Sequence, residues 1–317
     1  HQPRRQRQMC IRDSIKSSPK MMIGTVQFGI PYGIANNQGQ PSNEEVMAIM
    51  KHAHESGVDE YDTAAAYGES EKRLGYNFKE LGITKNVSVY TKIKPLRAEI
   101  SKSPKESEKA IIHSLEQSLR DLKIECLKGV LFHREEDAIY LDILQRQKDL
   151  GKCEAIGISC GHHSYSVKEW IKQGLVDALQ IPANIMDKRH FEIIYSKENQ
   201  NKIMIFLRSI FLQGILTMKN SNIPVVLKKL KPLHLKYSTL AHQTGMSLKE
   251  FALRVMMNSC VRSIILGNDS LKQFKENLAF IEKGPLPNDV MDQMNECDCE
   301  VDPKWVTPSL WPSSDEA

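Results

Sequence analysis

The sequence lacks several features that would assign it to other classes of protein. No apolar run approaches the ~18 residues that span a bilayer, so we expect no contact with a membrane. The formal net charge is only +4, and no Lys/Arg tract is joined to aromatic residues, which argues against a nucleic-acid partner. The seven cysteines are irregularly spaced and form no paired C-x-x-C motif. We therefore expect no metal site, reduced thiols and a cytoplasmic location.

The first 20 residues are basic and show no periodic apolar pattern. They contain no apolar core of the kind that a secretory signal has, so we expect a disordered or non-native extension outside the fold. Residues 21–317 are then expected to form a single domain with a short C-terminal tail. Hydrophobic residues at 41% and charged residues at 26% are ordinary for a globular domain.

From residue 21 onward, short apolar runs alternate with amphipathic segments. Strands are expected at residues 21–28, 58–62, 87–91, 127–132, 155–159, 178–181, 203–207 and 262–266. Helices are expected after a cap at Ser42 or Asn43 and at residues 71–81, 106–122, 137–150, 167–173, 190–196, 228–243, 247–257 and 270–281. This alternation predicts an α/β fold, a closed (β/α)₈ TIM barrel. A doubly wound open sheet is the alternative, but the sequence lacks a G-x-G-x-x-G turn after its first strand.

Polar residues stand at the C-terminal ends of the expected strands. They are Gln27, Asp62, Lys92, His133, Ser159, Gln180, Asn184 and Arg208. In a parallel barrel these ends converge on one face, where such barrels build their active sites. The stretch after Asp62 adds a phenol, Tyr67, and the tight turn that Gly68 allows.

Four residues of this face predict acid–base chemistry: Asp62, Tyr67, Lys92 and His133. A phenol has an ordinary pKa near ~10, which is too high for efficient proton transfer at neutral pH. An ammonium group beside a phenol stabilises the phenolate, and a carboxylate beside the ammonium keeps it charged and in place. His133 would hydrogen-bond a substrate oxygen and orient it. Such a site could protonate a carbonyl oxygen while hydride reaches the carbon.

The stretch from Asp62 to Glu71 reads D-T-A-A-A-Y-G-E-S-E, and two further strands end in Tyr90-Thr91-Lys92 and Leu131-Phe132-His133. These motifs resemble those of the aldo-keto reductase family, over residues 21 to about 312. The resemblance implies a barrel that binds NADP(H) in an extended form, without a Rossmann domain, and reduces an aldehyde, ketone or sugar carbonyl. It also implies that Tyr67 is the general acid/base, that Lys92 and Asp62 tune it, and that His133 positions the carbonyl.

The same resemblance implies which residues hold the cofactor. Gly24 and Thr25 would lie near the nicotinamide beside Asp62, and Ser159 and Gln180 would bind its carboxamide. The loop 208–214 would hold the pyrophosphate and the segment 263–277 the adenosine. The cofactor residues implied in these two segments are Arg208, Ser209, Leu212, Gly214, Gly267, Gln273 and Asn277.

The sequence departs from the family pattern at two places. Cys160 stands where the family usually has Asn, which removes a good donor to the carboxamide. Gly267 and Gln273 stand where many members carry Lys or Arg for a 2'-phosphate, and Asp269 is close by. NADP(H) remains the cofactor that the resemblance to the family implies. NAD(H) is the alternative, because a cation for the 2'-phosphate is missing at these positions.

The substrate is expected to be a small molecule with a carbonyl group. A small residue, Ala183, beside polar neighbours favours a sugar-like or small aldehyde substrate over a steroid. Pro31, Tyr32, Phe132 and Phe211 are further candidates for the substrate pocket. In the C-terminal tail, Trp305 or Trp311 would either reach this pocket or pack on the barrel.

A serine hydrolase is the strongest alternative to a reductase. Residues 157–161 read G-I-S-C-G, the G-x-S-x-G pattern in which Ser159 would be the nucleophile, with His162 or His163 nearby. This alternative leaves Asp62, Tyr67 and Lys92 without a role.

Two further alternatives are compatible with the same chain. A metal-dependent barrel would use His52, His54, His133 and the pair 162–163, but the first two fall inside an expected helix away from the strand ends. A barrel that binds a nucleotide and acts as a regulatory subunit would share the same fold and the same residues.

Overall fold

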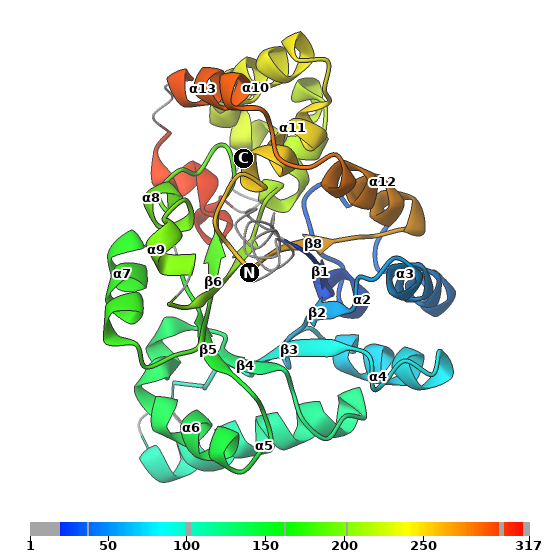
Figure 1. Ribbon diagram of the computed structural model, residues 1–317, viewed down its shortest axis with the longest axis vertical. Coiled ribbons are helices and arrows are strands. Elements are labelled where there is room, and N and C mark those ends of the chain that lie inside the picture. The colour runs from blue at the N-terminus through cyan, green and yellow to red at the C-terminus, as the bar shows by residue number, and fades with distance from the viewer. Residues whose placement is uncertain are drawn as a thin grey trace, which may run out of the picture.

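The computed structural model describes residues 20–36, 38–98, 103–161, 163–200, 202–297 and 301–312. They form a closed barrel of eight parallel strands in sequential order, with helices around the outside (Figure 1). The predicted (β/α)₈ fold is confirmed. Lys20 opens the first strand, and the rest of the expected N-terminal extension lies outside the described residues. Within the described ranges, no helix has the length and apolar character needed to span a bilayer.

The strands and helices alternate along the whole chain. The strands are β1 (Lys20–Gly24), β2 (Glu60–Asp62), β3 (Ser88–Ile93), β4 (Gly129–Phe132), β5 (Ile156–Ser159), β6 (Ala178–Pro182), β7 (Met204–Arg208) and β8 (Ser263–Gly267). The helices up to β6 are α2 (Val26–Gly29), α3 (Asn43–Glu55), α4 (Ser70–Glu80), α5 (Pro104–Leu122), α6 (Leu141–Asp149) and α7 (Ser164–Gln173). Those after β6 are α8 (Phe191–Ile194), α9 (Lys197–Gln200), α10 (Lys231–Gln243), α11 (Leu248–Met256), α12 (Leu271–Glu282) and α13 (Asn288–Glu296).

Short 3₁₀ helices complete the connections. They are η1 (Glu135–Tyr140), η2 (Leu212–Thr217), η3 (Asn220–Asn222), η4 (Val225–Leu230), η5 (Pro303–Val306) and η6 (Pro308–Leu310). Of the two candidates for the first cap, Ser42 is the N-cap of α3, because its Oγ accepts from Glu45 N–H at 3.2 Å, and Ser247 Oγ caps α11 by accepting from Glu250 N–H at 3.1 Å. Each cap satisfies a backbone donor that the helix leaves unpaired.

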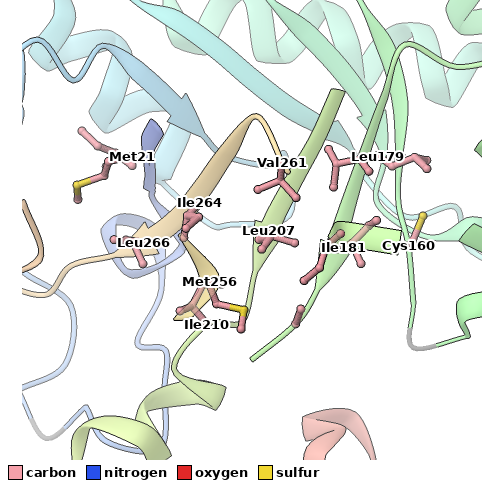
Figure 2. Close-up of a cluster of buried hydrophobic side chains, with 14 of the residues drawn as sticks. Met21, Cys160, Leu179, Ile181, Leu207, Ile210, Met256, Val261, Ile264 and Leu266 are labelled. Carbon is pink, nitrogen blue, oxygen red and sulfur yellow. The ribbon is translucent and has the colours of Figure 1, made fainter. Parts of the chain in front are cut away.

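The strands bury side chains on both faces, as expected for a parallel sheet covered by helices. A small inner cluster fills the barrel and consists of Met22, Tyr90, Leu131, Ala178, Phe206 and Ile265. The alternate residues point outward and pack under the helices in a much larger cluster. Figure 2 shows part of it, including Met21, Leu179, Ile181, Leu207, Ile264 and Leu266 from the strands and Met256 from α11.

The first strand is shorter than the apolar run 21–28 suggested. β1 ends at Gly24, and residues 26–29 form the helical turn α2. The last sheet hydrogen bond of β1 runs from Thr25 N–H to Asp62 O at 3.0 Å, and the Thr25 hydroxyl donates to the same oxygen at 2.9 Å. The Phe28 N–H then donates to Thr25 O at 2.9 Å, which begins the helical turn. The prediction of a strand over residues 25–28 was wrong, since a short apolar run does not distinguish a buried strand from a buried helical turn. Gln27 consequently lies on α2 and not at a strand end.

Other segments also differ from the prediction, and the expected helix 137–150 begins in the 3₁₀ helix η1. The expected loop 208–214 passes into the 3₁₀ helix η2, and the start of the expected helix 228–243 is the 3₁₀ helix η4. Helix α13 had no predicted counterpart. Its apolar face is short, with Met291 and Met294 as its buried residues, so the helical period was not evident from the sequence.

Two glycines let the loop after β2 pack backbone to backbone against α2. A Cβ on Gly29 would overlap the carbonyl oxygen of Tyr67, and a Cβ on Gly68 would overlap the carbonyl oxygen of Gly29. Gly68 also has φ 54°, in the left-handed region that disfavours other residues. This contact fixes the loop that carries Tyr67 on the rim of the barrel.

Gly29→Ala tests this contact. The added methyl group meets backbone that has no room to retreat, and overpacking of this kind costs about 1–3 kcal/mol. Gly57→Ala is the matched control, because Gly57 has φ 74° but open space around its Cβ position. This variant should lose only the ~1–2 kcal/mol of stability that a left-handed backbone costs a residue with a side chain. We expect the thermal unfolding midpoint to fall further for Gly29→Ala and its near-ultraviolet tyrosine signal to change. An equal or smaller fall than for Gly57→Ala would contradict the close contact.

Candidate active site

The barrel places the predicted polar residues in one layer because side chains alternate along a strand. Tyr90, Leu131, Ala178 and Phe206 point inward and fill the barrel. The residue two positions further along each segment points the same way, one layer nearer the C-terminal end. These residues are Lys92, His133, Gln180 and Arg208. The packed interior therefore forms the floor on which the site stands.

Asp62 and Lys92 form a buried ion pair at the centre of this layer. Lys92 Nζ lies 2.7 Å from Asp62 Oδ1, and the two side chains are 1% and 6% exposed. The ammonium also donates to Thr63 O at 2.9 Å, and Gln180 Nε2 donates to the same Asp62 oxygen at 2.7 Å. Burial acts to lower the pKa of Lys92, but the Asp62 carboxylate and Tyr67 outweigh it and hold that pKa above its usual value. Lys92 is therefore a fixed positive charge.

Tyr67 lies against this ion pair. Its hydroxyl oxygen is 3.4 Å from Lys92 Nζ, and the ammonium is 5.0 Å from the centre of its ring. The Tyr67 N–H donates to Ala64 O at 2.9 Å, which with Gly68 shapes the turn. Tyr67 lines the cavity described below. The carboxylate and phenol of one segment and the ammonium of another are thereby brought into one connected group.

His133 stands beside the phenol as a neutral imidazole. Its ring packs edge-on against Tyr67, with 5.6 Å between ring centres. Burial lowers the pKa of His133 to about 3, and the positive charges of Lys92, Arg208 and Arg134 act in the same direction. Its buried Nδ1 has no hydrogen-bond partner among the described residues. At neutral pH this side chain can position a substrate oxygen but carries no extra proton to give.

A cavity of about 750 Å³ extends from these residues across the end of the barrel. Its walls include most residues that the resemblance assigns to the cofactor: Gly24, Thr25, Ser159, Gln180, Arg208, Ser209, Gly214, Gly267, Gln273 and Asn277. Leu212 is buried and does not line it. Two buried acceptors at the wall, Gln27 Oε1 and Asn277 Oδ1, have no partner among the described residues. The volume and these acceptors fit an extended dinucleotide.

The loop after β7 has a strained backbone. Ser209, Leu212 and Gln213 have φ values of 64°, 46° and 52°, although none of them is glycine. Gly214 follows with φ 98°. Such conformations are uncommon and cluster at ligand sites, because surrounding structure must hold them in place. The strain supports the expectation that this loop contacts a ligand.

The far end of the cavity carries carboxylates that sequence reasoning only partly identified. Asp269 lines the wall, and burial raises the pKa of its carboxyl group. Glu276 also lines the wall and pairs with Lys249 at 2.5 Å. Lys249 could not be identified from the sequence, because it lies near the start of α11 and reaches Glu276 only through the packing of α11 beside α12.

Only some of the residues predicted to contact the substrate line the cavity. Tyr32 and Phe211 line the cavity, whereas Pro31 does not, and Phe132 and Ala183 are fully buried away from it. In the tail, Trp311 Nε1 donates to Trp305 O at 2.8 Å, and both rings pack against the outer core. The tail therefore packs on the barrel, and the argument from Ala183 for a sugar-like substrate loses its basis.

The geometry does not favour the serine hydrolase. A nucleophile elbow needs a serine in a strained turn, but Ser159 is the last residue of β5 and is not among the residues with positive φ. Burial raises the pKa of the neighbouring Cys160 thiol. His163 stands at the start of α7, and His162 lies outside the described residues.

The metal site finds no support in the described part of the chain. No group of three or more His, Cys, Asp or Glu side chains is arranged there to hold a metal ion. His52 and His54 lie in α3, and His54 Nδ1 is 2.7 Å from Asp59 Oδ1.

Comparisons with known proteins agree with this geometry. The family model "Aldo/keto reductase family" matches residues 20–299. Among solved structures, the aldo-keto reductase AKR11C1 from Bacillus halodurans in its holo form has a TM-score of 0.71 and 20% identity, over 89% of this chain and 93% of that chain. The glycerol dehydrogenase AKR11B4 from Gluconobacter oxydans has a TM-score of 0.68 and 19% identity, over 89% and 94%. No curated protein sequence matches significantly.

The two structural neighbours share the barrel fold, and the family model covers most of the chain, including all four residues of the predicted acid–base group. The chain belongs to the aldo/keto reductase family.

Proposed function

We propose that this protein reduces the carbonyl group of an aldehyde, ketone or sugar with a nicotinamide cofactor, and that Tyr67 provides the proton. The observation that carries the proposal is the contact of Lys92 with both Asp62 and Tyr67, at 2.7 and 3.4 Å in a buried position. Membership of the family supports oxidoreductase chemistry in general. The assignment of each residue rests on the site geometry.

The four residues divide the work of proton transfer. His133 is neutral at physiological pH, because its pKa is held near 3, so it orients the carbonyl oxygen and is not the acid. Tyr67 donates its hydroxyl proton to that oxygen as negative charge develops on it. Lys92 then faces the phenolate oxygen and stabilises it, and Asp62 keeps Lys92 in place. In alcohol oxidation the same groups act in reverse.

The cofactor supplies the hydride that reaches the carbonyl carbon. Gly24, Thr25, Ser159 and Gln180 would hold its nicotinamide end, next to Tyr67. Residues of the strained loop and of β8 and α12 would hold the rest, namely Ser209, Gly214, Gly267, Gln273 and Asn277. Cys160 would not bind the carboxamide of the cofactor, because its thiol is a weak donor and its carbonyl already accepts from Arg208. Ser159 and Gln180 would therefore hold the carboxamide.

We propose further that NAD(H) is preferred over NADP(H). The resemblance implies that the adenosine lies against residues 263–277, and there the wall carries Asp269 and Glu276. The lysine nearby, Lys249, is already paired with Glu276. The cavity's other lysine, Lys219, precedes η3 and lies outside that segment. A 2'-phosphate against residues 263–277 would therefore meet these two carboxylates, whereas a ribose hydroxyl can donate to a carboxylate.

Tyr67→Phe is the direct test of the proton donor. A positioned general acid contributes roughly 10²–10⁴-fold to rate, so kcat for NAD(P)H oxidation by a panel of aldehydes, ketones and sugars should fall by that factor. Binding of the cofactor, followed by nicotinamide fluorescence, should change little. Tyr76→Phe is the control, because Tyr76 is an exposed tyrosine on α4.

Most of the activity surviving in Tyr67→Phe would exclude Tyr67 as the acid. If the unmodified protein binds the cofactor tightly but oxidises it with no member of the panel, the regulatory alternative would replace the proposed function.

Asp269→Ser tests the cofactor preference. The unmodified protein should bind NADH at least ~10-fold more tightly than NADPH, because an unpaired like charge is costly at a binding site. The substitution should move this ratio toward NADPH, and Asp292→Ser, at an exposed position on α13, should not. Tighter binding of NADPH by the unmodified protein would contradict the proposal.

A further inference from the structure

Arg208 is a cation at the mouth of the barrel whose charge has no partner in the described residues. Its Nη2 donates to Cys160 O at 2.9 Å and its Nη1 to Ser209 Oγ at 3.2 Å. Its buried Nε has no hydrogen-bond partner there, and no described carboxylate lies within ion-pairing distance of the guanidinium. Other part-buried arginines, Arg254 and Arg262, each pair with a carboxylate.

The guanidinium points toward the acid–base group and away from the adenosine end. Arg208 ends β7, and Cys160, to which it donates, follows β5, so the side chain crosses over β6. The adenosine segment begins at β8, on the opposite side of β7. This direction differs from the role in pyrophosphate binding that the resemblance implies for Arg208.

Electrostatic effects place Arg208 within reach of the reacting groups. Its positive charge contributes, after burial and Lys92, to the low pKa of His133. It also acts on Tyr32, whose pKa burial and Tyr67 raise and Arg208 lowers. All of these side chains except Lys92 line the same cavity.

The charges of the catalytic end do not balance without a ligand. Asp62 neutralises Lys92, and His133 is neutral. Glu135 lies beside Cys160, where its carboxylate accepts from Gly161 N–H, but it does not line the cavity. Among the side chains that line this end of the cavity, the Arg208 guanidinium therefore adds one positive charge that no carboxylate pairs with. A guanidinium offers a planar fork of donors that matches a carboxylate or a phosphate.

We propose that Arg208 binds an anionic group of the substrate, so that the protein acts on carbonyl compounds that carry a carboxylate or a phosphate. This inference rests on the proposed function and adds the substrate class to it. Arg208 would hold the anion while His133 and Tyr67 contact the carbonyl oxygen, which fixes the position of the reacting carbon.

Matched substrate pairs test this class. The pairs are succinic semialdehyde with butanal, glucuronate with glucose, and glyceraldehyde 3-phosphate with glyceraldehyde, and they separate a carboxylate from a phosphate. Charge-assisted hydrogen bonds imply a preference of roughly 10–100-fold in kcat/KM for the anionic member of at least one pair. In Arg208→Gln that ratio should fall close to one, and Arg208→Lys should retain part of it.

Arg146→Gln is the matched control for net charge, because Arg146 lies on the outer surface of α6 and pairs with Glu108 and Asp142. It should leave the ratio unchanged. The cofactor dissociation constant of Arg208→Gln should stay close to that of the unmodified protein. Equal loss of activity toward both members of a pair, or weaker cofactor binding with an unchanged ratio, would overturn the proposal and assign Arg208 to the cofactor.

Two outcomes separate this proposal from the proposed function. Turnover of neutral substrates as fast as their anionic partners would overturn the anionic class and leave carbonyl reduction standing. If no carbonyl compound is reduced, calorimetric binding of malonate and inorganic phosphate to the protein with its cofactor still decides the role of Arg208. Binding that is lost in Arg208→Gln would support the anion site, and equal binding to both proteins would overturn it.

Discussion

The buried ion pair between Asp62 and Lys92 is the interaction on which the rest of the site depends. Moving two charges out of water is costly, and their attraction offsets this only when geometry and further hydrogen bonds are good. Here Gln180 donates to the carboxylate and Thr63 O accepts from the ammonium, so the ends of β2, β3 and β6 are tied together. Within this pair the Lys92 ammonium is held in a fixed position beside Tyr67 and is shielded from solvent.

The two ends of the cavity differ in charge. This difference underlies the proposed preference for NAD(H) and the proposed anionic substrate. The catalytic end has a neutralised ion pair, a neutral imidazole and the unpaired Arg208. The adenosine end has Asp269 and the Glu276–Lys249 pair. A cofactor without a 2'-phosphate and a substrate with an anionic group together match this distribution. Each proposal stands on different residues, so one can fail without the other.

Much of this architecture could be predicted from the sequence. The alternation of apolar runs and amphipathic helices predicted the barrel, because strand and helix periods are local properties. The place of Lys92 at the end of an expected strand predicted that it lies on the C-terminal face, because the ends of parallel strands meet there. The early end of β1 could not be predicted, because the apolar run 21–28 is compatible both with a buried strand and with a buried helical turn.

The direction of Arg208 and the pairing of Lys249 with Glu276 also escaped prediction. Both depend on which elements become neighbours once the barrel closes, and a motif comparison assigns a role to a position without giving the direction of its side chain. The same limit applies to Ala183, which sequence reasoning placed in the substrate pocket and the fold buries.

The central claim is that the charge of Lys92 lets Tyr67 exchange a proton at neutral pH. The pH dependence of alcohol oxidation by Lys92→Met tests it most directly, because in that direction Tyr67 must accept the proton. A phenol without a neighbouring ammonium ionises only near ~10. We predict that the residual rate of Lys92→Met is very low and rises at distinctly higher pH than the rate of the unmodified protein. A rise at the same pH in both proteins, or a residual rate that does not depend on pH, would contradict the account.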